Sequence, residues 1–183
     1  RAQSVTVASE TVRRAQECGL TGQVTIAAAF GCPFEGEVQA TTVVDMARKL
    51  AETSPREIAL ADTIGVGVPA QVGDLVAAVA EAIAPIPVRI HLHNTRNTGI
   101  ANVWAAVEAG AVTVDSALGG LGGCPFAPGA AGNVATEDVL YMLERSGVST
   151  GIDLEKAIAA SRWLSGVMDR DLPAMVSKAP LFP

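Results

Sequence analysis

The chain has 183 residues, of which 49% are hydrophobic and only 4% aromatic, so it can bury a core built mainly from Ala, Val, Leu and Ile. A formal net charge of -6, without a block of Lys and Arg, argues against nucleic acid as a partner. Gly, Pro or a charge interrupts each apolar run before the roughly 20 residues of a membrane-spanning helix, so we expect no membrane partner either.

Short stretches rich in β-branched residues alternate with helix-length segments along the chain. The predicted strands cover residues 24–30, 57–62, 88–93 and 112–118. The predicted helices cover residues 4–17, 40–53, 69–84, 99–108, 133–145 and 153–168. We therefore expect a single domain over residues 1–183, in which four strand and helix units follow a first helix, and an extra helix near 153–168 ends the pattern.

Repeated βα units of about 30 residues predict a parallel sheet, either in an open doubly wound fold or in a closed barrel. No GxGxxG or GxxxxGK[ST] motif follows a predicted strand, which weakens the nucleotide-binding versions of an open sheet. The candidate functional groups all fall at the carboxyl ends of strands, where a barrel places its active site. We expect an α/β fold, the (β/α)8 TIM barrel, with this chain supplying about the C-terminal four strands and their helices.

The motif HLHNT contains the only two histidines of the chain, His91 and His93, at the end of a predicted strand. Because side chains alternate along a strand, both imidazoles project from the same face and could bind one metal ion. The alternative is a buried, hydrogen-bonded histidine beside a rim residue. We favour metal ligation because both residues fall at a strand end in a fold whose strand ends carry function. A zinc hydrolase that uses the pair to activate water is the competing function of another class.

Asn133 ends the glycine-rich stretch GGLGGCPFAPGAAGN, which covers residues 119–133. On local sequence alone, Asn133 is best explained as the N-cap of the helix that follows. Its amide oxygen could instead join the two imidazoles as a third metal ligand. That ligand set is consistent with Mg²⁺ or Mn²⁺, although the histidines alone would also suit Zn²⁺.

The chain has three cysteines and no CxxC pair, which favours a reducing compartment, the cytoplasm or, in a eukaryote, the mitochondrial matrix. Cys124 lies in the glycine-rich loop, where a thiol near a cation could act as a general acid or base. Cys18 and Cys32 are interpreted as small buried hydrophobic residues. Asp62 ends a predicted strand and is a candidate either to support a metal ligand or to transfer a proton, and the alternative is an Asp that stabilises a turn or a helix start. Asp115 lies inside a predicted strand and is a candidate for the barrel interior.

The stretch SALGGLGGCPFAPGAAGNVATEDVLYML, at 116–143, resembles the signature region of the 3-hydroxy-3-methylglutaryl-CoA lyase family. The segments AFGCPFEGEV, IALADTIGVGVPAQV and HLHNT support the resemblance and occur in the same order. The resemblance implies a Mg²⁺ or Mn²⁺ cofactor held by His91, His93 and Asn133. It also implies a catalytic set formed by Cys124, Asp62, His91 and Glu137.

The activity implied by the resemblance is retro-Claisen cleavage of 3-hydroxy-3-methylglutaryl-CoA to acetyl-CoA and acetoacetate, with an acyl-CoA as partner molecule and a homodimer as assembly. The family's remaining metal ligand, an Asp, and a neighbouring Arg lie on the first barrel strand, before Arg1. The alternatives are a related lyase or aldolase acting on another 3-hydroxyacyl-CoA or a 2-oxo acid, and an inactive half-barrel.

Overall fold

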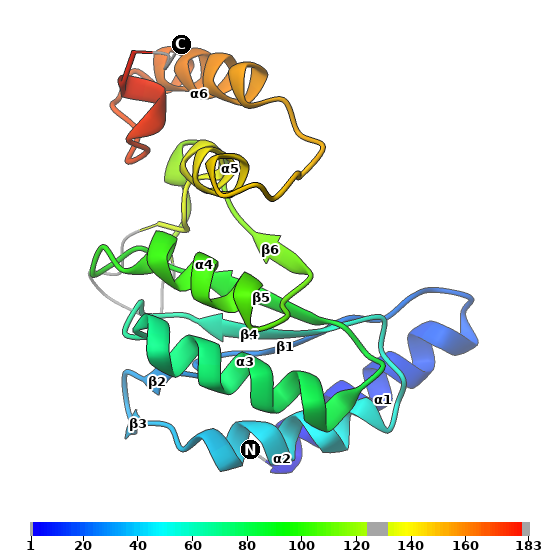
Figure 1. Cartoon of the computed structure of the whole chain (residues 1–183). Coiled ribbons are helices and arrows are strands. Elements are labelled where there is room, and N and C mark those ends of the chain that lie inside the picture. Colours follow the sequence, from blue (N-terminus) through cyan, green and yellow to red (C-terminus); the bar gives the residue numbers. More distant parts are fainter. Residues whose placement is uncertain (1, 124–131, 181–183) are drawn as a thin grey trace.

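The structure, a computed structural model, describes residues 2–123 and 132–180. Its main element is a parallel sheet of four strands, drawn at the centre of Figure 1. The strands are β1 (Val24–Ile26), β4 (Ile58–Asp62), β5 (Val88–Leu92) and β6 (Thr113–Asp115), and they neighbour one another in that order. Because the spatial order of these strands follows the chain without a reversal, the sheet is a segment of a barrel rather than a doubly wound sheet. The predicted fold class is confirmed.

Helices follow the strands as the sequence predicts. They are α1 (Ala2–Glu17), α2 (Ala40–Ala51), α3 (Pro69–Ile83), α4 (Gly99–Glu108), α5 (Thr136–Arg145) and α6 (Leu154–Met168). Helices α2, α3 and α4 pack side by side against one face of the sheet (Figure 1). No helix within 2–123 or 132–180 is both long and apolar enough to cross a membrane.

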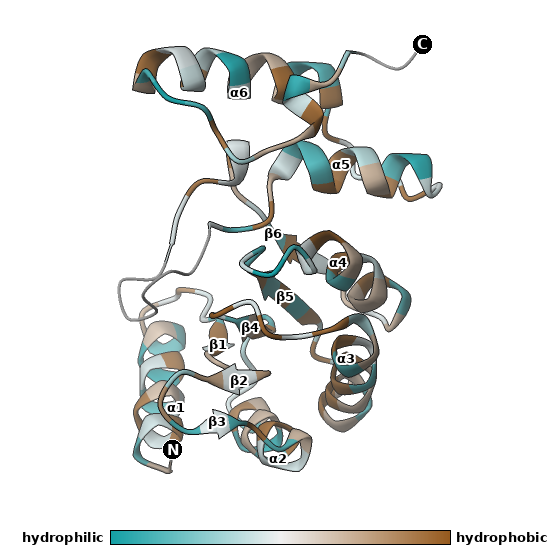
Figure 2. Ribbon diagram, turned by 90° about the vertical axis from the view of Figure 1, so that its left-hand side faces the viewer, coloured by the Kyte–Doolittle hydropathy of each residue, from teal (hydrophilic) through white to brown (hydrophobic). Residues whose placement is uncertain are grey.

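The two faces of the sheet differ in chemistry. Ile58, Leu60 and Ile90 point toward the helices and are fully buried, which supplies the hydrophobic stabilisation of the domain. Figure 2 shows the matching hydrophobic residues along α3 and α4. Residues of the opposite parity, such as Arg89 and His91, line the other face, which is the interior side of a barrel. The polar side chains of β5 therefore lie on the face opposite the helices.

Strand β1 is shorter than the predicted 24–30. Ala28 has a φ of 52°, in the left-handed region, so the chain turns away after Ile26. It then forms a small antiparallel hairpin, β2 (Gly31–Cys32) and β3 (Gly36–Glu37). The sequence did not predict this hairpin, because the apolar run AAAF resembles a continuation of the strand. Cys32 is half-buried in this hairpin, whereas Cys18 is exposed beyond α1, so the prediction that Cys18 is a buried hydrophobic residue is wrong.

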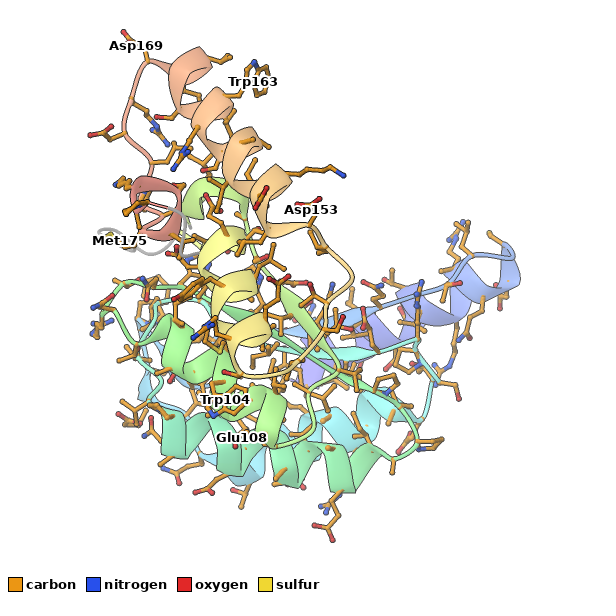
Figure 3. All side chains as sticks on the ribbon, turned by 45° about the horizontal axis from the view of Figure 1, so that its top comes forward. Trp104, Glu108, Asp153, Trp163, Asp169 and Met175 are labelled. Carbon is orange, nitrogen blue, oxygen red and sulfur yellow. The ribbon has the colours of Figure 1, made fainter. Side chains whose placement is uncertain are left out.

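Helices α5 and α6 and the 3₁₀ turn η2 (Val176–Lys178) lie together beyond α4. The carboxylate of Asp138 in α5 accepts hydrogen bonds from the backbone N–H groups of Met175 and Val176, at 3.1 and 2.7 Å. Figure 3 shows Asp153 at the start of α6 and Asp169 just past its end. The hydrogen bonds of Asp138 hold α5, the helix that follows the glycine-rich stretch, against the segment before η2.

Candidate functional site

The two histidines meet at the carboxyl end of β5. Their Nε2 atoms lie 3.3 Å apart, and the ring centroids are 5.2 Å apart with an interplanar angle of 62°. His93 is buried, while the His91 side chain is 31% exposed. Because metal–nitrogen bonds of imidazole are about 2.1 Å long, this separation suits two ligands of a single ion. The predicted common face of His91 and His93 is thus what the fold produces.

Asn133 lies directly beside this pair. It forms an isolated antiparallel bridge with His93, supported by a 3.1 Å hydrogen bond from the Val134 N–H to the Leu92 carbonyl. The side-chain Nδ2 of Asn133 donates to the Leu121 carbonyl at 2.9 Å. Its Oδ1 is buried and accepts no hydrogen bond from the part of the chain that the structure describes. An unsatisfied buried acceptor is uncommon, and an amide oxygen beside two imidazoles fits a divalent cation.

The predicted role of Asn133 as a helix N-cap is wrong. Helix α5 begins at Thr136, and Ala135 occupies the N-cap position without a side-chain hydrogen bond. Residues 132–135 instead run as extended chain beside the ends of β5 and β6, since Ala135 also bridges Ala117. The amide of Asn133 is therefore available to the site.

An open pocket of about 420 Å³ lies next to these groups, lined by His91, Val114, Asp115, Ser116 and Asn133. Within the described ranges 2–123 and 132–180, no cluster of three His, Cys, Asp or Glu side chains could hold a metal. From the residues that the structure describes, an ion would thus rest on two imidazoles and one amide oxygen. A larger pocket of about 770 Å³, between α5, α6 and η2, contains none of the predicted site residues.

Asp62 takes a different place from the histidines. It pairs with Leu92 in the register of β4 and β5, so it shares the helix-covered face, and it is fully buried. Its Oδ1 accepts from the Val66 N–H at 3.0 Å and its Oδ2 from the Gly67 N–H at 2.8 Å. These contacts hold the loop after β4 and use both oxygens. A role of Asp62 in proton transfer stays a prediction.

The contacts of Asp62 predict a structural effect of its removal. Asp62→Ala leaves two backbone N–H groups without their acceptor, so we expect the free energy of unfolding to fall by about 2–4 kcal/mol in urea denaturation. The control Asp74→Ala, at an exposed position of α3, should change it by less than about 0.5 kcal/mol. Unchanged stability of Asp62→Ala together with lost turnover would instead place Asp62 in the chemistry.

Glu137 is fully buried in the first turn of α5. Its Oε2 accepts from the Gly119 N–H at 3.0 Å, while its Oε1 is buried and accepts no hydrogen bond from the described residues. Gly119 has a φ of 67°, and a Cβ there would collide with Leu172. Glu137 therefore anchors the 3₁₀ turn η1 (Leu118–Gly120), in which the glycine-rich stretch begins. Its catalytic role stays a prediction.

Cys124 lies outside the described residues, so its proposed role depends on the sequence alone. The residues just before 124 approach Asn133, whose backbone N–H donates to the Leu121 carbonyl at 3.3 Å. Gly122 has a φ of 100°, and a Cβ there would lie 2.5 Å from the Asn133 Nδ2. Glycine at 122 thus permits the close approach that positions the amide of Asn133.

Asp115, a predicted candidate for the barrel interior, lies beside His91, and the structure adds Arg89 and Glu57, which the sequence did not single out. Asp115 contacts His91, with 3.2 Å between Oδ2 and Nδ1, and Arg89 lies 3.6 Å from the other Asp115 oxygen. Glu57 lies on the far side of the same guanidinium. Alternation along β5 would have placed Arg89 on the face of the histidines, but its charged neighbours depend on strand register.

These observations define an α/β-barrel protein with a polar site at the carboxyl ends of its strands. The model of the family described as HMGL-like matches residues 1–164, and the chain belongs to this family. It is 51% identical over 166 residues to the (R)-citramalyl-CoA lyase of Chloroflexus aurantiacus, covering 90% of this chain and 52% of that protein. It is 39% identical to a hydroxymethylglutaryl-CoA lyase of Bacillus subtilis and 36% identical to the human mitochondrial hydroxymethylglutaryl-CoA lyase. Those alignments cover 87% and 92% of this chain, and 54% and 52% of the relatives.

Solved structures agree. A structure of an HMG-CoA lyase from Acinetobacter baumannii with coenzyme A and 3-methylmalate superposes with a TM-score of 0.91 at 42% identity, covering 100% of this chain and 61% of that one. The HMG-CoA lyase of Bacillus subtilis gives 0.90 at 36% identity, covering 97% and 60%. The predicted resemblance is confirmed, and the chain spans about half the length of the curated relatives it matches.

Proposed function

We propose that the protein is a divalent-metal-dependent carbon–carbon lyase. Its substrate is the CoA thioester of a branched 3-hydroxy dicarboxylic acid, and it breaks a carbon–carbon bond within the acyl group. The observation that carries this proposal is the pair of Nε2 atoms of His91 and His93, 3.3 Å apart, next to Asn133, which bridges His93 and whose buried Oδ1 accepts no hydrogen bond from residues 2–123 or 132–180. Nitrogen and oxygen donors with room for substrate suit Mg²⁺ or Mn²⁺. Membership in the HMGL-like family supports the reaction class.

The acyl group that we infer is citramalyl, with 3-hydroxy-3-methylglutaryl as the second candidate. The sequence motifs indicate the glutaryl substrate, but the identity of 51% to a citramalyl-CoA lyase exceeds the 39% and 36% to hydroxymethylglutaryl-CoA lyases. The relative from A. baumannii binds 3-methylmalate, which is also a four-carbon hydroxy diacid with one methyl branch. The two candidate substrates share a carbinol carbon β to the thioester and differ by one methylene before the distal carboxylate.

Cleavage breaks the bond between the carbinol carbon and the carbon next to the thioester. A base removes the hydroxyl proton, and the electron pair of the O–H bond forms the new carbonyl. The electron pair of the broken carbon–carbon bond becomes the enolate of acetyl-CoA. When bound, the cation supplies positive charge that lowers the cost of removing this proton. Cys124 then donates a proton to the enolate carbon, which completes acetyl-CoA. The other product is pyruvate from citramalyl-CoA or acetoacetate from the glutaryl substrate.

The other site residues position the metal donors and the loops beside them. Asn133 and His93 are fixed against each other by backbone pairing, so the three donor atoms are oriented before substrate arrives. Glu137 anchors the turn that precedes the loop of Cys124. Asp62 secures the loop after β4.

The test is a substrate comparison on the full-length protein with added MgCl₂ or MnCl₂. Pyruvate is followed with lactate dehydrogenase and acetoacetate with 3-hydroxybutyrate dehydrogenase. Because one methylene changes discrimination by roughly 10-fold to 200-fold, we expect kcat/KM for citramalyl-CoA to exceed that for the glutaryl substrate by at least about tenfold.

Three other outcomes have definite meanings. A preference for the glutaryl substrate would reverse the assignment of the acyl group and keep the reaction. Release of free CoA by hydrolysis, without either keto acid, would support the zinc hydrolase instead. Turnover that persists in excess EDTA would contradict dependence on a divalent metal.

A further inference from the structure

The interior face of the sheet carries its charged residues in register. Arg89 of β5 pairs with Thr113 of β6, and the next interior pair is His91 with Asp115. Toward β4 the partners of Arg89 and His91 are Ala59 and Ala61, whose small side chains leave space for the longer ones. The register therefore brings a guanidinium, an imidazole and carboxylates to adjacent positions.

Their contacts form one continuous path. The His91 Nδ1 lies 3.2 Å from Asp115 Oδ2, and the other oxygen of Asp115 lies 3.6 Å from Arg89 Nη1. The Arg89 Nε lies 3.7 Å from Glu57 Oε1, a charge contact too long for a hydrogen bond, while Glu57 Oε2 accepts from the Thr113 hydroxyl at 3.0 Å. The side chains of Arg89 and Glu57 are only 17% and 10% exposed, so solvent screens this contact less than it screens a surface ion pair.

A carboxylate can only accept hydrogen bonds, so the proton between Asp115 and a neutral His91 must sit on Nδ1. The Nε2 of His91 then carries the lone pair, and it is the atom that faces His93 Nε2 at 3.3 Å. Histidines that bind metals commonly donate their other ring N–H to such a partner, which fixes both the tautomer and the orientation of the ring. None of these contacts requires an ion to be present.

We propose that Asp115 is a positioning residue: it locks His91 in the Nδ1–H tautomer and so presents Nε2 to the cation, while Arg89, paired with Glu57, holds the Asp115 carboxylate in place. What Nε2 binds rests on the proposed function. The tautomer itself is a property of the metal-free protein, so it can be tested independently.

The first measurement is the tautomer of His91 by long-range ¹H–¹⁵N NMR of the metal-free, full-length protein at about pH 8.5, where imidazole is ordinarily neutral. A His91→Gln spectrum assigns the His91 ring signals by their disappearance. In the wild type we expect the proton on Nδ1. In Asp115→Ala that population should fall, and Asp115→Asn should be intermediate, because its amide oxygen accepts without a charge. A wild-type His91 with its proton on Nε2 would overturn the proposal.

The second measurement is Mn²⁺ affinity, followed by the EPR signal of free Mn²⁺. Loss of such a partner costs about 10-fold to 100-fold in metal affinity, which is the weakening expected for Asp115→Ala. Asp74→Ala, which removes an exposed carboxylate on α3, should leave the affinity unchanged. If Asp115→Ala fails to fold, Asp115→Asn carries the comparison.

The outcomes separate the two proposals. Unchanged tautomer and unchanged Mn²⁺ affinity in a folded Asp115 variant would overturn the role of Asp115. A locked tautomer and weakened Mn²⁺ binding, with no cleavage of either acyl-CoA by the wild type, would support the role of Asp115 and remove the proposed function.

Discussion

His93→Ala is expected to abolish tight Mn²⁺ binding and to lower kcat/KM by at least about a thousandfold. His93 is buried, and its Nε2 is the nitrogen that faces His91. Its backbone also pairs with Asn133, which carries the third donor atom. A bound cation contributes several kcal/mol to stabilising charge in the transition state, and a thousandfold loss corresponds to about 4 kcal/mol. EPR titration of Mn²⁺ and steady-state kinetics on the full-length protein measure both effects.

The comparison needs variants that keep the fold. Urea denaturation of His93→Ala should show a cooperative transition, so that lost binding is not lost structure. Thr98→Ala, at the start of α4 with its hydroxyl bonded to the Gly67 carbonyl, is the control and should retain Mn²⁺ affinity. Retention of full metal affinity by His93→Ala would remove the histidine pair as the metal centre.

The fold could be predicted because its signals are local and repeated. The alternation of β-branched stretches with helix-length segments reproduced the order of elements, and the same alternation along β5 placed His91 and His93 on one face. The turn after β1 was missed because AAAF has no residue that marks a break, yet Ala28 adopts a positive φ. Local composition cannot reveal a turn that tertiary packing imposes.

The site was less predictable because it depends on contacts between distant segments. Asn133 has the residue type of a helix N-cap, but pairing with His93 fixes its place instead. Asp62 has the parity of Ile58 and Leu60, a signal available from the sequence that would have set it apart from the histidines. The contact of Arg89 with Asp115 requires the register of two strands, which no single segment encodes.

Cys124→Ala is expected to lower kcat by about 10²-fold to 10⁴-fold while leaving Mn²⁺ affinity unchanged, because a general acid contributes that much and the thiol is not among the metal donors. The chain offers a matched control, since the tetrapeptide GCPF occurs at 31–34 as well as at 123–126. Cys32, in the first copy, is a half-buried free thiol of the β2 hairpin, so Cys32→Ala should retain turnover.

Kinetics in D₂O would sharpen the assignment. The proton that Cys124 gives to the enolate carbon exchanges with solvent, so wild-type turnover should place one deuterium in the methyl group of acetyl-CoA. Cys124→Ser should be slower than the wild type, because a hydroxyl is a weaker acid than a thiol and makes proton donation rate-limiting. Full turnover by Cys124→Ala, or an equal loss in Cys32→Ala, would show that Cys124 is not the proton donor. The role that the family resemblance implies for this residue would then be wrong.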